Sequence, residues 1–308
     1  MRSESAVTVK GLCKRFGSFT AVDHIDFTVR KGEIFGFLGA NGAGKTTTIR
    51  MLCGLLRPSE GVGKVAGFDI MTDTEMIKTR IGYMSQKFSL YDDLTIMENI
   101  SFFGGLYGLS ARELGKRGRE VIEWAGLAGM ERRITSTLAG GWKQRLALGT
   151  ALLHEPEIIF LDEPTAGVDP VSRRNFWKII QEIAHRGVTV FVTTHYLDEA
   201  EYCHSIRLMD RGRIIAAGAP EELKKEVITE KMYQMETDQP ARAVHILKTL
   251  QDISGASLLG IKINILTDLP EQELKQMVLE KMSAEEIRVE SLEPVDPTLE
   301  DVFIRLIK

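Results

Sequence analysis

The sequence predicts an α/β fold followed by a small α+β domain. In residues 1–224, short apolar strands alternate with amphipathic helices, which is typical of a parallel or mixed sheet covered by helices on both faces. A glycine-rich loop joins one of these strands to a helix, and the pattern of elements changes after residue 224. The chain has 308 residues, 44% hydrophobic and 27% charged, so it can bury a large core and form about two domains.

The chain opens with β structure. Apolar residues at 7–12 indicate a first strand, and residues 22–29 a second in which apolar and polar side chains alternate. A third strand at 33–38 runs into the glycine-rich loop, and a helix begins near Gly44. Pro58 lies beyond the last turn of that helix, where a helix is expected to have ended.

Residues 88–155 indicate a helical subdomain, and β and α segments then alternate. Its helices are expected at 94–107, 111–124 and 142–154. After it we expect, in order, a buried strand at 158–164, a helix at 171–185, a buried strand at 188–195, a short helix at 197–202 and a hairpin at 206–218.

The second domain, residues 225–308, spans about 80 residues, which is too short for another domain of the first kind. It is expected to hold a strand, a helix, a hairpin at 257–266, a helix at 271–282, a strand at 287–292 and a helix at 298–307.

The composition limits the partners and the cellular compartment that we expect for this chain. The net charge is −4, from 39 basic and 43 acidic residues, so no nucleic-acid partner is expected. Cys13, Cys53 and Cys203 are far apart and lack metal-ligand spacing, which predicts buried, reduced thiols in a cytosolic protein. We expect neither a signal peptide nor a transmembrane helix, because no window approaches about 18 apolar residues. Work at a membrane would therefore need a partner.

Residues 39–46, GANGAGKT, match the pattern G-x-x-x-x-G-K-[ST]. The glycines let several backbone N–H groups surround phosphate oxygens, and the following helix adds its positive N-terminus. Lys45 is expected to reach the β and γ phosphates, and the Thr46 hydroxyl to ligate Mg²⁺. Because the loop follows an apolar strand and opens a helix, it predicts a P-loop NTPase fold that binds ATP and Mg²⁺.

The strand at 158–164, IIFLDEP, delivers two acids at its end. Asp162 is expected to hold the Mg²⁺ shell. Glu163 points elsewhere and is the candidate general base for the attacking water.

The first 224 or so residues resemble the nucleotide-binding subunit of ABC transporters, with its motifs in the family's order. The resemblance implies catalytic or metal-sensing roles for the Q-loop residue Gln86, which also couples to the membrane partner, and for the switch residue His195, which contacts the γ phosphate. It also implies that four parts of the chain contact the nucleotide, with the ring of Phe16 stacking on adenine. The other three are the Walker A loop (Gly39, Asn41, Gly42, Gly44, Lys45, Thr46 and Thr47), the signature segment (Ala139, Gly140 and Gly141) and the D-loop (Asp169).

The signature segment, residues 138–142, departs from the family's usual LSGGQ, because Ala139 replaces the serine and Trp142 the glutamine. In the family that serine donates to the γ phosphate bound on the opposite subunit, and alanine cannot. A hydrogen bond to a charged group contributes about 1.5–3 kcal/mol, so we expect weaker closure or slower turnover. The backbone N–H groups of Gly140 and Gly141 can still bind phosphate.

The resemblance also implies partners. The chain would pair head-to-tail with a second copy and drive a separate polytopic permease, lying peripherally at the cytoplasmic face of the plasma membrane and in the cytosol when isolated. The apolar segment 88–107 can form subdomain core, a groove for a cytoplasmic helix of the permease, or both on different faces.

The ending at 297–306, PTLEDVFIRL, resembles that of ATPase subunits of ABC-2-type exporters, which export drugs, antibiotics, lipids or polysaccharides. We expect its domain to be a structural or dimerising appendage. One alternative is a soluble ABC ATPase acting on DNA or ribosomes, which usually has a coiled-coil insert or two nucleotide domains in one chain. Another is a P-loop kinase, which would leave residues 140–145 and His195 unexplained.

Overall fold

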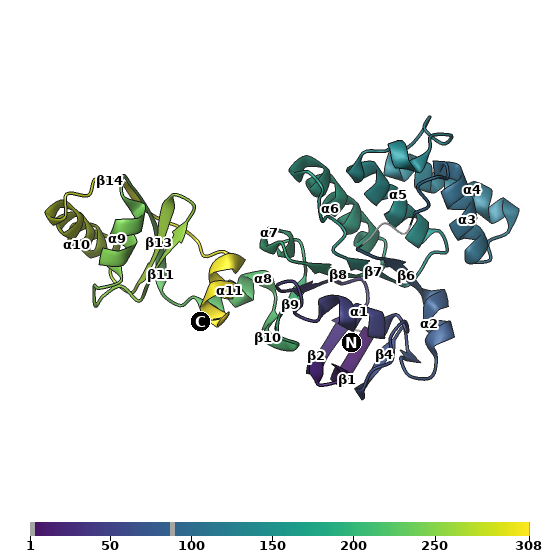
Figure 1. The fold of residues 1–308 in the computed structure, drawn as a ribbon, viewed down its shortest axis with the longest axis horizontal. Helices are drawn as coiled ribbons and strands as arrows, with labels where there is room; N and C mark the ends of the chain where they lie inside the picture. Colours follow the sequence, from purple (N-terminus) through teal and green to yellow (C-terminus); the bar gives the residue numbers. More distant parts are fainter. Residues whose placement is uncertain (1–3, 87–89, 308) are drawn as a thin grey trace. The chain divides into compact units, whose positions relative to one another are not determined.

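The computed structural model of the chain describes residues 4–86 and 90–307, which fall into the units Met1–Pro220 and Glu221–Lys308 (Figure 1). The first unit holds two sheets between helices, and the second holds a sheet with helices of its own. The predicted α/β fold followed by an α+β domain is confirmed.

The first sheet of the N-terminal unit is antiparallel, in the order β2-β1-β4-β5. Its strands are β1 (Ser5–Phe16), β2 (Phe19–Arg30), β4 (Glu60–Val65) and β5 (Phe68–Asp69). The last two strands, and the helix α2 (Thr74–Arg80) after them, are absent from the sequence-based prediction. Glycines at 61 and 63 interrupt the apolar alternation that identifies a strand.

The second sheet is mixed, in the order β10-β9-β3-β8-β7-β6. Its strands are β3 (Ile34–Leu38), β6 (Ile81–Met84), β7 (Ile158–Asp162), β8 (Thr189–Thr194), β9 (Ser205–Asp210) and β10 (Arg213–Gly218). All neighbours pair in parallel except the β9–β10 hairpin. The carboxyl ends of β3, β6, β7 and β8 therefore meet at one edge, which is where ligands bind in open α/β sheets.

Phenylalanine rings join the two sheets. Phe27 of β2 packs against Phe35 and Phe37 of β3, and Phe191 of β8 touches Phe160 of β7. The ring centroids in this cluster lie between 5.0 and 6.0 Å apart, a range in which each aromatic pair adds about 0.5–1.5 kcal/mol beyond simple burial. This packing fixes the strands whose ends carry the phosphate loop and the two acids.

Apart from α2, the α-helices of the N-terminal unit agree with the prediction to within about two residues. They are α1 (Lys45–Leu52), α3 (Ile96–Leu106), α4 (Ala111–Ala125), α5 (Gly140–Leu152), α6 (Pro170–His185) and α7 (Leu197–Ala200). Capping boxes start α3 at Thr95 and α4 at Ser110. The predicted start of α5 at residue 142 is wrong, because the chain turns helical directly after the extended residue Ala139 (ψ 153°).

The C-terminal unit has the β-α-β-β-α-β order of ferredoxin-like domains, with an antiparallel sheet in the order β12-β13-β11-β14. Its elements are α8 (Pro220–Val227), β11 (Lys231–Thr237), α9 (Pro240–Leu247), β12 (Gly255–Leu259), β13 (Lys262–Thr267), α10 (Glu271–Ala284), β14 (Val289–Pro294) and α11 (Leu299–Ile307). Apolar side chains of α9 and α10 pack on the sheet through residues such as Leu247 and Val278.

None of the helices in the described part of the chain combines the length and the hydropathy that a bilayer span requires.

Candidate active site

The phosphate loop connects β3 to α1 and depends on two glycines with left-handed backbone. Gly39 has φ 151° and Gly44 has φ 108°. A Cβ atom at Gly39 would lie 2.2 Å from the carbonyl oxygen of Met209, and one at Gly44 would lie 2.5 Å from that of Ala21. Neither position accepts a side chain, so glycine at both lets the loop pack closely against its neighbours just before the N-terminus of α1.

Lys45, the first residue of α1, is 4% exposed. Its Nζ donates to the carbonyl oxygens of Gly39 (2.8 Å) and Ala40 (3.1 Å) and lies 3.4 Å from Oε1 of Glu163. Burial lowers the pKa of Lys45, and the carboxylate of Glu163 opposes that shift. The ammonium is therefore held at the mouth of the loop by groups that a phosphate can replace.

Asp162, the last residue of β7, is buried beside two hydroxyl groups. Its Oδ1 accepts hydrogen bonds from Thr46 Oγ1 (2.9 Å) and Thr193 Oγ1 (2.7 Å). Burial raises the pKa of Asp162, and these two hydrogen bonds work against that rise. A desolvated carboxylate next to the Thr46 hydroxyl is an oxygen donor set that suits Mg²⁺.

Glu163 is the meeting point of the predicted catalytic residues. It has φ 49°, a left-handed conformation that costs a non-glycine residue about 1–3 kcal/mol and tends to occur at functional sites. Its Oε2 accepts a hydrogen bond from Gln86 Nε2 (3.0 Å) and lies 3.2 Å from His195 Nδ1. With the contact to Lys45, three residues from three separate segments converge on this one carboxylate.

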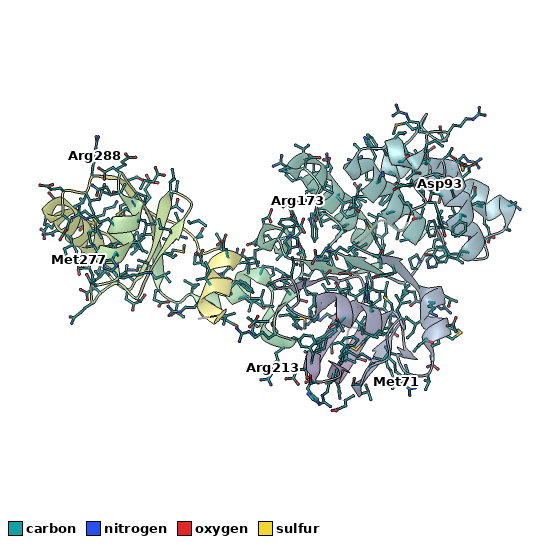
Figure 2. The ribbon with its side chains drawn as sticks, viewed as in Figure 1. Met71, Asp93, Arg173, Arg213, Met277 and Arg288 are labelled. Atoms are coloured by element: carbon teal, nitrogen blue, oxygen red, sulfur yellow. The ribbon has the colours of Figure 1, made fainter. Side chains whose placement is uncertain are left out.

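A third buried carboxylate, Glu199, is absent from the sequence-based prediction. Its two oxygens accept hydrogen bonds from Thr165 Oγ1 (2.5 Å) and Thr194 Oγ1 (2.6 Å), and Arg173 Nε lies 3.6 Å away. Thr194 Oγ1 in turn accepts from the backbone N–H of Tyr196 (3.0 Å). Glu199 thus ties the segment after Glu163 to the segment that carries His195. The arginine of this network is labelled in Figure 2.

Phe16 ends β1 with half of its surface (50%) exposed, and the Lys14 ammonium lies 5.1 Å from its ring centroid. An exposed ring face is what stacking on adenine requires. Asn41 and Gly42 are exposed at the tip of the phosphate loop, and Thr47 is half-buried on α1.

The signature segment and Asp169 lie at the starts of two other helices. Ala139 is the N-cap of α5 without a side-chain hydrogen bond, and Gly140 and Gly141 form its first turn. Asp169 caps α6, where its Oδ1 accepts from the N–H groups of Val171 and Ser172, and the bonds from Ser172 lower the pKa of Asp169. Among the described residues, no hydrogen bond or ion pair joins these four residues to Glu163.

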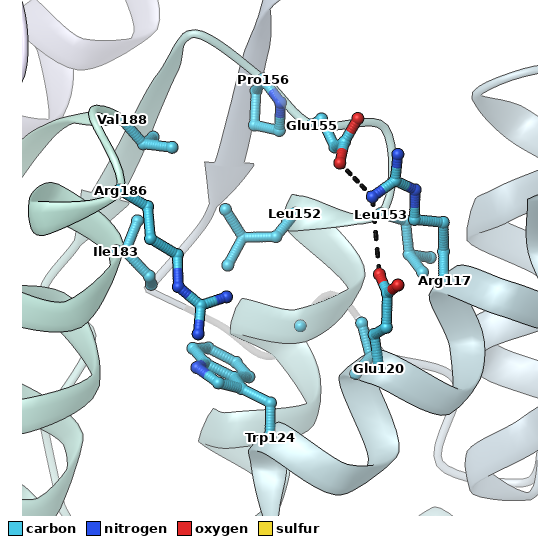
Figure 3. Close-up of a pocket in the computed structure, with 12 residues that line it drawn as sticks. Arg117, Glu120, Trp124, Leu152, Leu153, Glu155, Pro156, Ile183, Arg186 and Val188 are labelled. Atoms are coloured by element: carbon cyan, nitrogen blue, oxygen red, sulfur yellow. Dashed lines mark hydrogen bonds and ion pairs between the residues drawn. The ribbon is translucent and has the colours of Figure 1, made fainter.

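A hollow of about 320 Å³ lies at the amino ends of β7 and β8, away from the edge that carries the phosphate loop (Figure 3). Its wall includes Trp124 and Ile183, and at its rim Arg117 pairs with Glu120 (3.5 Å) and with Glu155. None of the predicted site residues lines it, so it is not the nucleotide site.

Residues 22–166 match the family model described as "ABC transporter", and residues 218–307 match "ATP-binding protein DrrA1-3-like, C-terminal domain". The chain is 36% identical over 297 residues to the linearmycin resistance ATP-binding protein LnrL of Bacillus subtilis (strain 168), with 95% of each chain covered. The chain belongs to the ATP-binding proteins of ABC transporters. Members of this family hydrolyse ATP to power transport, and the resemblance inferred from the motifs is confirmed.

Other ABC ATP-binding proteins agree with this assignment. The probable multidrug ABC transporter ATP-binding protein YbhF of Escherichia coli (strain K12) is 50% identical over 223 residues, which is 72% of this chain and 39% of YbhF. The chain thus spans about two fifths of that relative's length. The daunorubicin resistance ATP-binding protein DrrA3 of Streptomyces coeruleorubidus is 36% identical over 306 residues, covering 98% of this chain and 93% of DrrA3.

Solved ABC cassettes share the fold of the N-terminal unit. The ADP conformation of the cassette MJ1267 superposes with a TM-score of 0.67 at 26% identity over 74% of this chain and 96% of MJ1267. The dimeric, post-hydrolysis structure of the cassette MJ0796 with ADP and Pi gives a TM-score of 0.63 at 26% identity, over 69% of this chain and 98% of that one. The predicted ABC-type P-loop fold is confirmed.

Proposed function

We propose that this chain is the ATP-hydrolysing subunit of an ABC-2-type exporter for a drug-like, lipid or polysaccharide substrate, with the permease on a separate chain. The observation that carries the proposal is the convergence of Lys45, Gln86 and His195 on Glu163 at the carboxyl edge of the parallel strands. Relatives named for multidrug transport and for resistance to linearmycin and daunorubicin support the exporter class.

Glu163 acts as the general base. It takes the proton of the attacking water as the new bond to the γ phosphorus forms and the bond to ADP breaks. Gln86 and His195 orient its carboxylate, and His195 also contacts the γ phosphate. Lys45 exchanges its carbonyl contacts for the β and γ phosphates of ATP, while the loop N–H groups bind the remaining oxygens.

Mg²⁺ would be held by Thr46, Asp162 and Gln86. The fit is supported by the buried Asp162 carboxylate, whose pKa burial raises and which already accepts a hydrogen bond from the Thr46 hydroxyl. When bound, the ion neutralises charge on the β and γ phosphates.

Each ATP also needs a second copy of the chain. Ala139, Gly140 and Gly141 present the N-terminus of α5 outside the cluster of their own chain, so a head-to-tail partner can cover the nucleotide with them. The dimeric structure of the related cassette MJ0796 supports this arrangement. Asp169, which caps α6, would lie in the same interface.

The permease is proposed to dock on the outer face of α3. Ile96 and Ile100 are buried in the subdomain core, whereas Phe102 and Leu106 are 45% and 69% exposed. Tyr91, also exposed, packs its ring 4.7 Å from that of Phe102. The buried face of α3 thus matches the expectation of subdomain core, and its exposed face is the one open to a helix of the permease. Residues 88 and 89 of segment 88–107 lie outside the described part of the chain. Docking would hold the chain at the cytoplasmic face of the membrane.

The test is the ATPase activity of the purified chain carrying Glu163→Gln. We expect turnover to fall by about 10²–10⁴-fold, the usual contribution of a general base, and an ATP-dependent dimer to accumulate on size exclusion. Glu157→Gln is the matched control, because Glu157 is exposed just before β7, where its side chain pairs with Arg80 (3.3 Å) and not with the residues around Glu163. Turnover in Glu163→Gln equal to that of the control would refute the assignment.

A further inference from the structure

A group of metal-ligating side chains lies outside the nucleotide site, on the antiparallel sheet. The Sγ of Cys13, a carboxylate oxygen of Asp23 and a ring nitrogen of His24 all lie within 4.8 Å of one another. Cys13 is fully buried on β1, Asp23 is half-buried and His24 is exposed, both on β2. The proposed ATP chemistry uses none of them.

The backbone at this place departs from a regular sheet in both strands. The register of β1 against β2 shifts on either side of Leu12 and again after Lys14, so Cys13 lies within an irregular stretch. His24 has φ 48°, the left-handed conformation that is strained for a residue with a side chain. Bulges and strained residues of this kind redirect side chains and gather at functional sites, and here they bring three donors together.

A fourth polar group completes the set. Glu60 of β4 pairs with Cys13 across the strands, and its Oε2 lies 2.9 Å from His24 Nε2. Asp23 Oδ1 lies 2.8 Å from the other ring nitrogen, Nδ1. Both ring nitrogens of His24 therefore face carboxylate oxygens.

We propose that Cys13, Asp23 and His24 bind a zinc ion, with Glu60 as the carboxylate that fixes the imidazole. One thiolate, one imidazole and one carboxylate are the ligand types that Zn²⁺ takes at tetrahedral sites, whereas Mg²⁺ takes oxygen alone. A zinc-bound histidine usually keeps its other ring nitrogen on a carboxylate or a backbone carbonyl, which is the role Glu60 can fill. Zinc binds the thiolate of Cys13 and the neutral imidazole of His24, so the thiol of Cys13 loses its proton when the ion binds.

Carboxylates and arginines share the surroundings of the site. The thiolate and the two carboxylates carry −3, and Zn²⁺ bound to them reduces this to −1 before the neighbouring arginines are counted. Two arginines lie at the rim: Arg213 Nε donates to Asp23 at 2.7 Å, and Arg15 pairs with Glu60. Figure 2 labels Arg213 on β10. The bound ion would tie β1 to β2 three residues before Phe16, the proposed adenine-stacking ring.

Cobalt(II) titration of the full-length chain without nucleotide tests the proposal, because Co²⁺ occupies zinc sites and thiolate ligation gives an intense near-ultraviolet charge-transfer band. We expect one such band that saturates at one Co²⁺ per chain. Zn²⁺ should remove it and excess Mg²⁺ should not. The thiolate band separates this site from Thr46 and Asp162, which offer only oxygen.

The three cysteines supply matched variants. Cys53 and Cys203 are buried like Cys13 but belong to no metal-ligating group in the described residues, so Cys53→Ala and Cys203→Ala should keep the band. Cys13→Ala should abolish it. His24→Asn should weaken Co²⁺ binding by at least about tenfold, since even outer partners of metal ligands are worth that much. Asparagine tolerates the left-handed backbone, so this variant should fold even if Cys13→Ala does not.

Zn²⁺ should also raise the thermal unfolding midpoint of the unaltered chain and raise that of His24→Asn by less, because a ligand that binds only the native state stabilises it in proportion to its affinity. The absence of a thiolate band in the unaltered chain would overturn the proposal. So would a band that survives Cys13→Ala, or an equal zinc effect on the midpoint of His24→Asn.

Discussion

Lys45 Nζ lies 3.4 Å from Oε1 of Glu163, and both side chains are more than nine-tenths buried. The lysine of the phosphate loop and the proposed base therefore neutralise each other in the absence of ATP. Because the γ phosphate competes for the same ammonium, ATP binding would free the carboxylate of Glu163 to take a proton from water.

This relationship predicts energetic coupling in a double-mutant cycle of Lys45→Met and Glu163→Gln. Each single change leaves the charge of the other residue buried and unpaired. Either substitution should therefore lower the free energy of unfolding more in the unaltered chain than in a chain that already carries the other substitution. We expect a coupling free energy of about 1–3 kcal/mol, measured from urea unfolding of the four proteins without nucleotide. Additive effects would mean that the pair does not interact in solution.

Ala139→Ser should tighten the ATP-dependent dimer. The hydroxyl can cap α5 and can donate to the γ phosphate of the opposite subunit, which is worth about 1.5–3 kcal/mol or roughly ten- to a hundredfold in affinity. Analytical ultracentrifugation in the Glu163→Gln background measures the dimer constant. Ala139→Asp is the control, because it caps the helix equally well but repels phosphate. If both variants dimerise like the parent, the missing hydroxyl is irrelevant to closure.

Glu199→Gln should lower kcat with little change in KM. Glutamine keeps one oxygen, so it can accept from Thr165 or Thr194 but not from both, and its amide N–H₂ would face the Arg173 guanidinium. Since small displacements of a catalytic group can cost up to about 10²-fold, we expect kcat to fall by roughly ten- to a hundredfold.

Asp198→Asn is the matched control for Glu199, since Asp198 lies on the same helix and pairs with the same Arg173 at 3.5 Å, but its side chain is 71% exposed. An exposed pair contributes little, so this variant should behave like the unaltered enzyme. Equal kinetics for the two variants, or a KM effect alone in Glu199→Gln, would remove Glu199 from the positioning of His195.

His154 predicts a pH dependence of stability. Its Nε2 donates to the carbonyl oxygen of Ile81 (2.9 Å), its Nδ1 is buried without a hydrogen bond, and its ring stacks 3.8 Å from that of Tyr107. Burial lowers the pKa of His154, so the native state favours the neutral ring. The stability from this group is present above the unfolded-state pKa of about 6.5 and is lost as the pH falls toward the lower folded pKa.

His154→Gln can keep the bond to Ile81 without titrating. Lowering the pH from about 7.5 to about 5.5 spans the ordinary histidine pKa. Over this interval the urea concentration at the unfolding midpoint should fall less in the variant than in the unaltered chain. An identical drop in both proteins would show that the ring is protonated as easily in the native state as in the unfolded one.

The fold and the cluster around Glu163 were predictable where the signal is local. The loop before Lys45 and the acids after the apolar strand at 158–164 are continuous motifs, and parallel strands bring their carboxyl ends to one edge whatever the loops between them. The ring of contacts from Gln86 and His195 agrees with the positions that the family resemblance implied. The catalytic roles of these residues stay predictions, as do the nucleotide contacts assigned to Phe16, to the phosphate loop, to residues 139–141 and to Asp169.

What could not be predicted depends on distant partners or on backbone detail. Thr165 and Glu199 are 34 residues apart. The acidic stretch that contains Glu199, DEAE at 198–201, is typical of a solvent-exposed surface. Cys13 and His24 meet through a register shift that no spacing rule encodes. The antiparallel pairing of residues 60–69 is formed by glycine-containing strands without clear apolar alternation.

The proposed partner of this ATPase is a separate membrane permease. We would capture tagged Glu163→Gln with Mg-ATP from detergent-solubilised membranes of the native cell, beside the same variant carrying Phe102→Glu on the outer face of α3, where Phe102 is 45% exposed. Recovery of a polytopic membrane protein with the first variant, and its loss with the second, is the predicted result. Recovery of ribosomal or DNA-associated proteins without any membrane protein would contradict the exporter assignment.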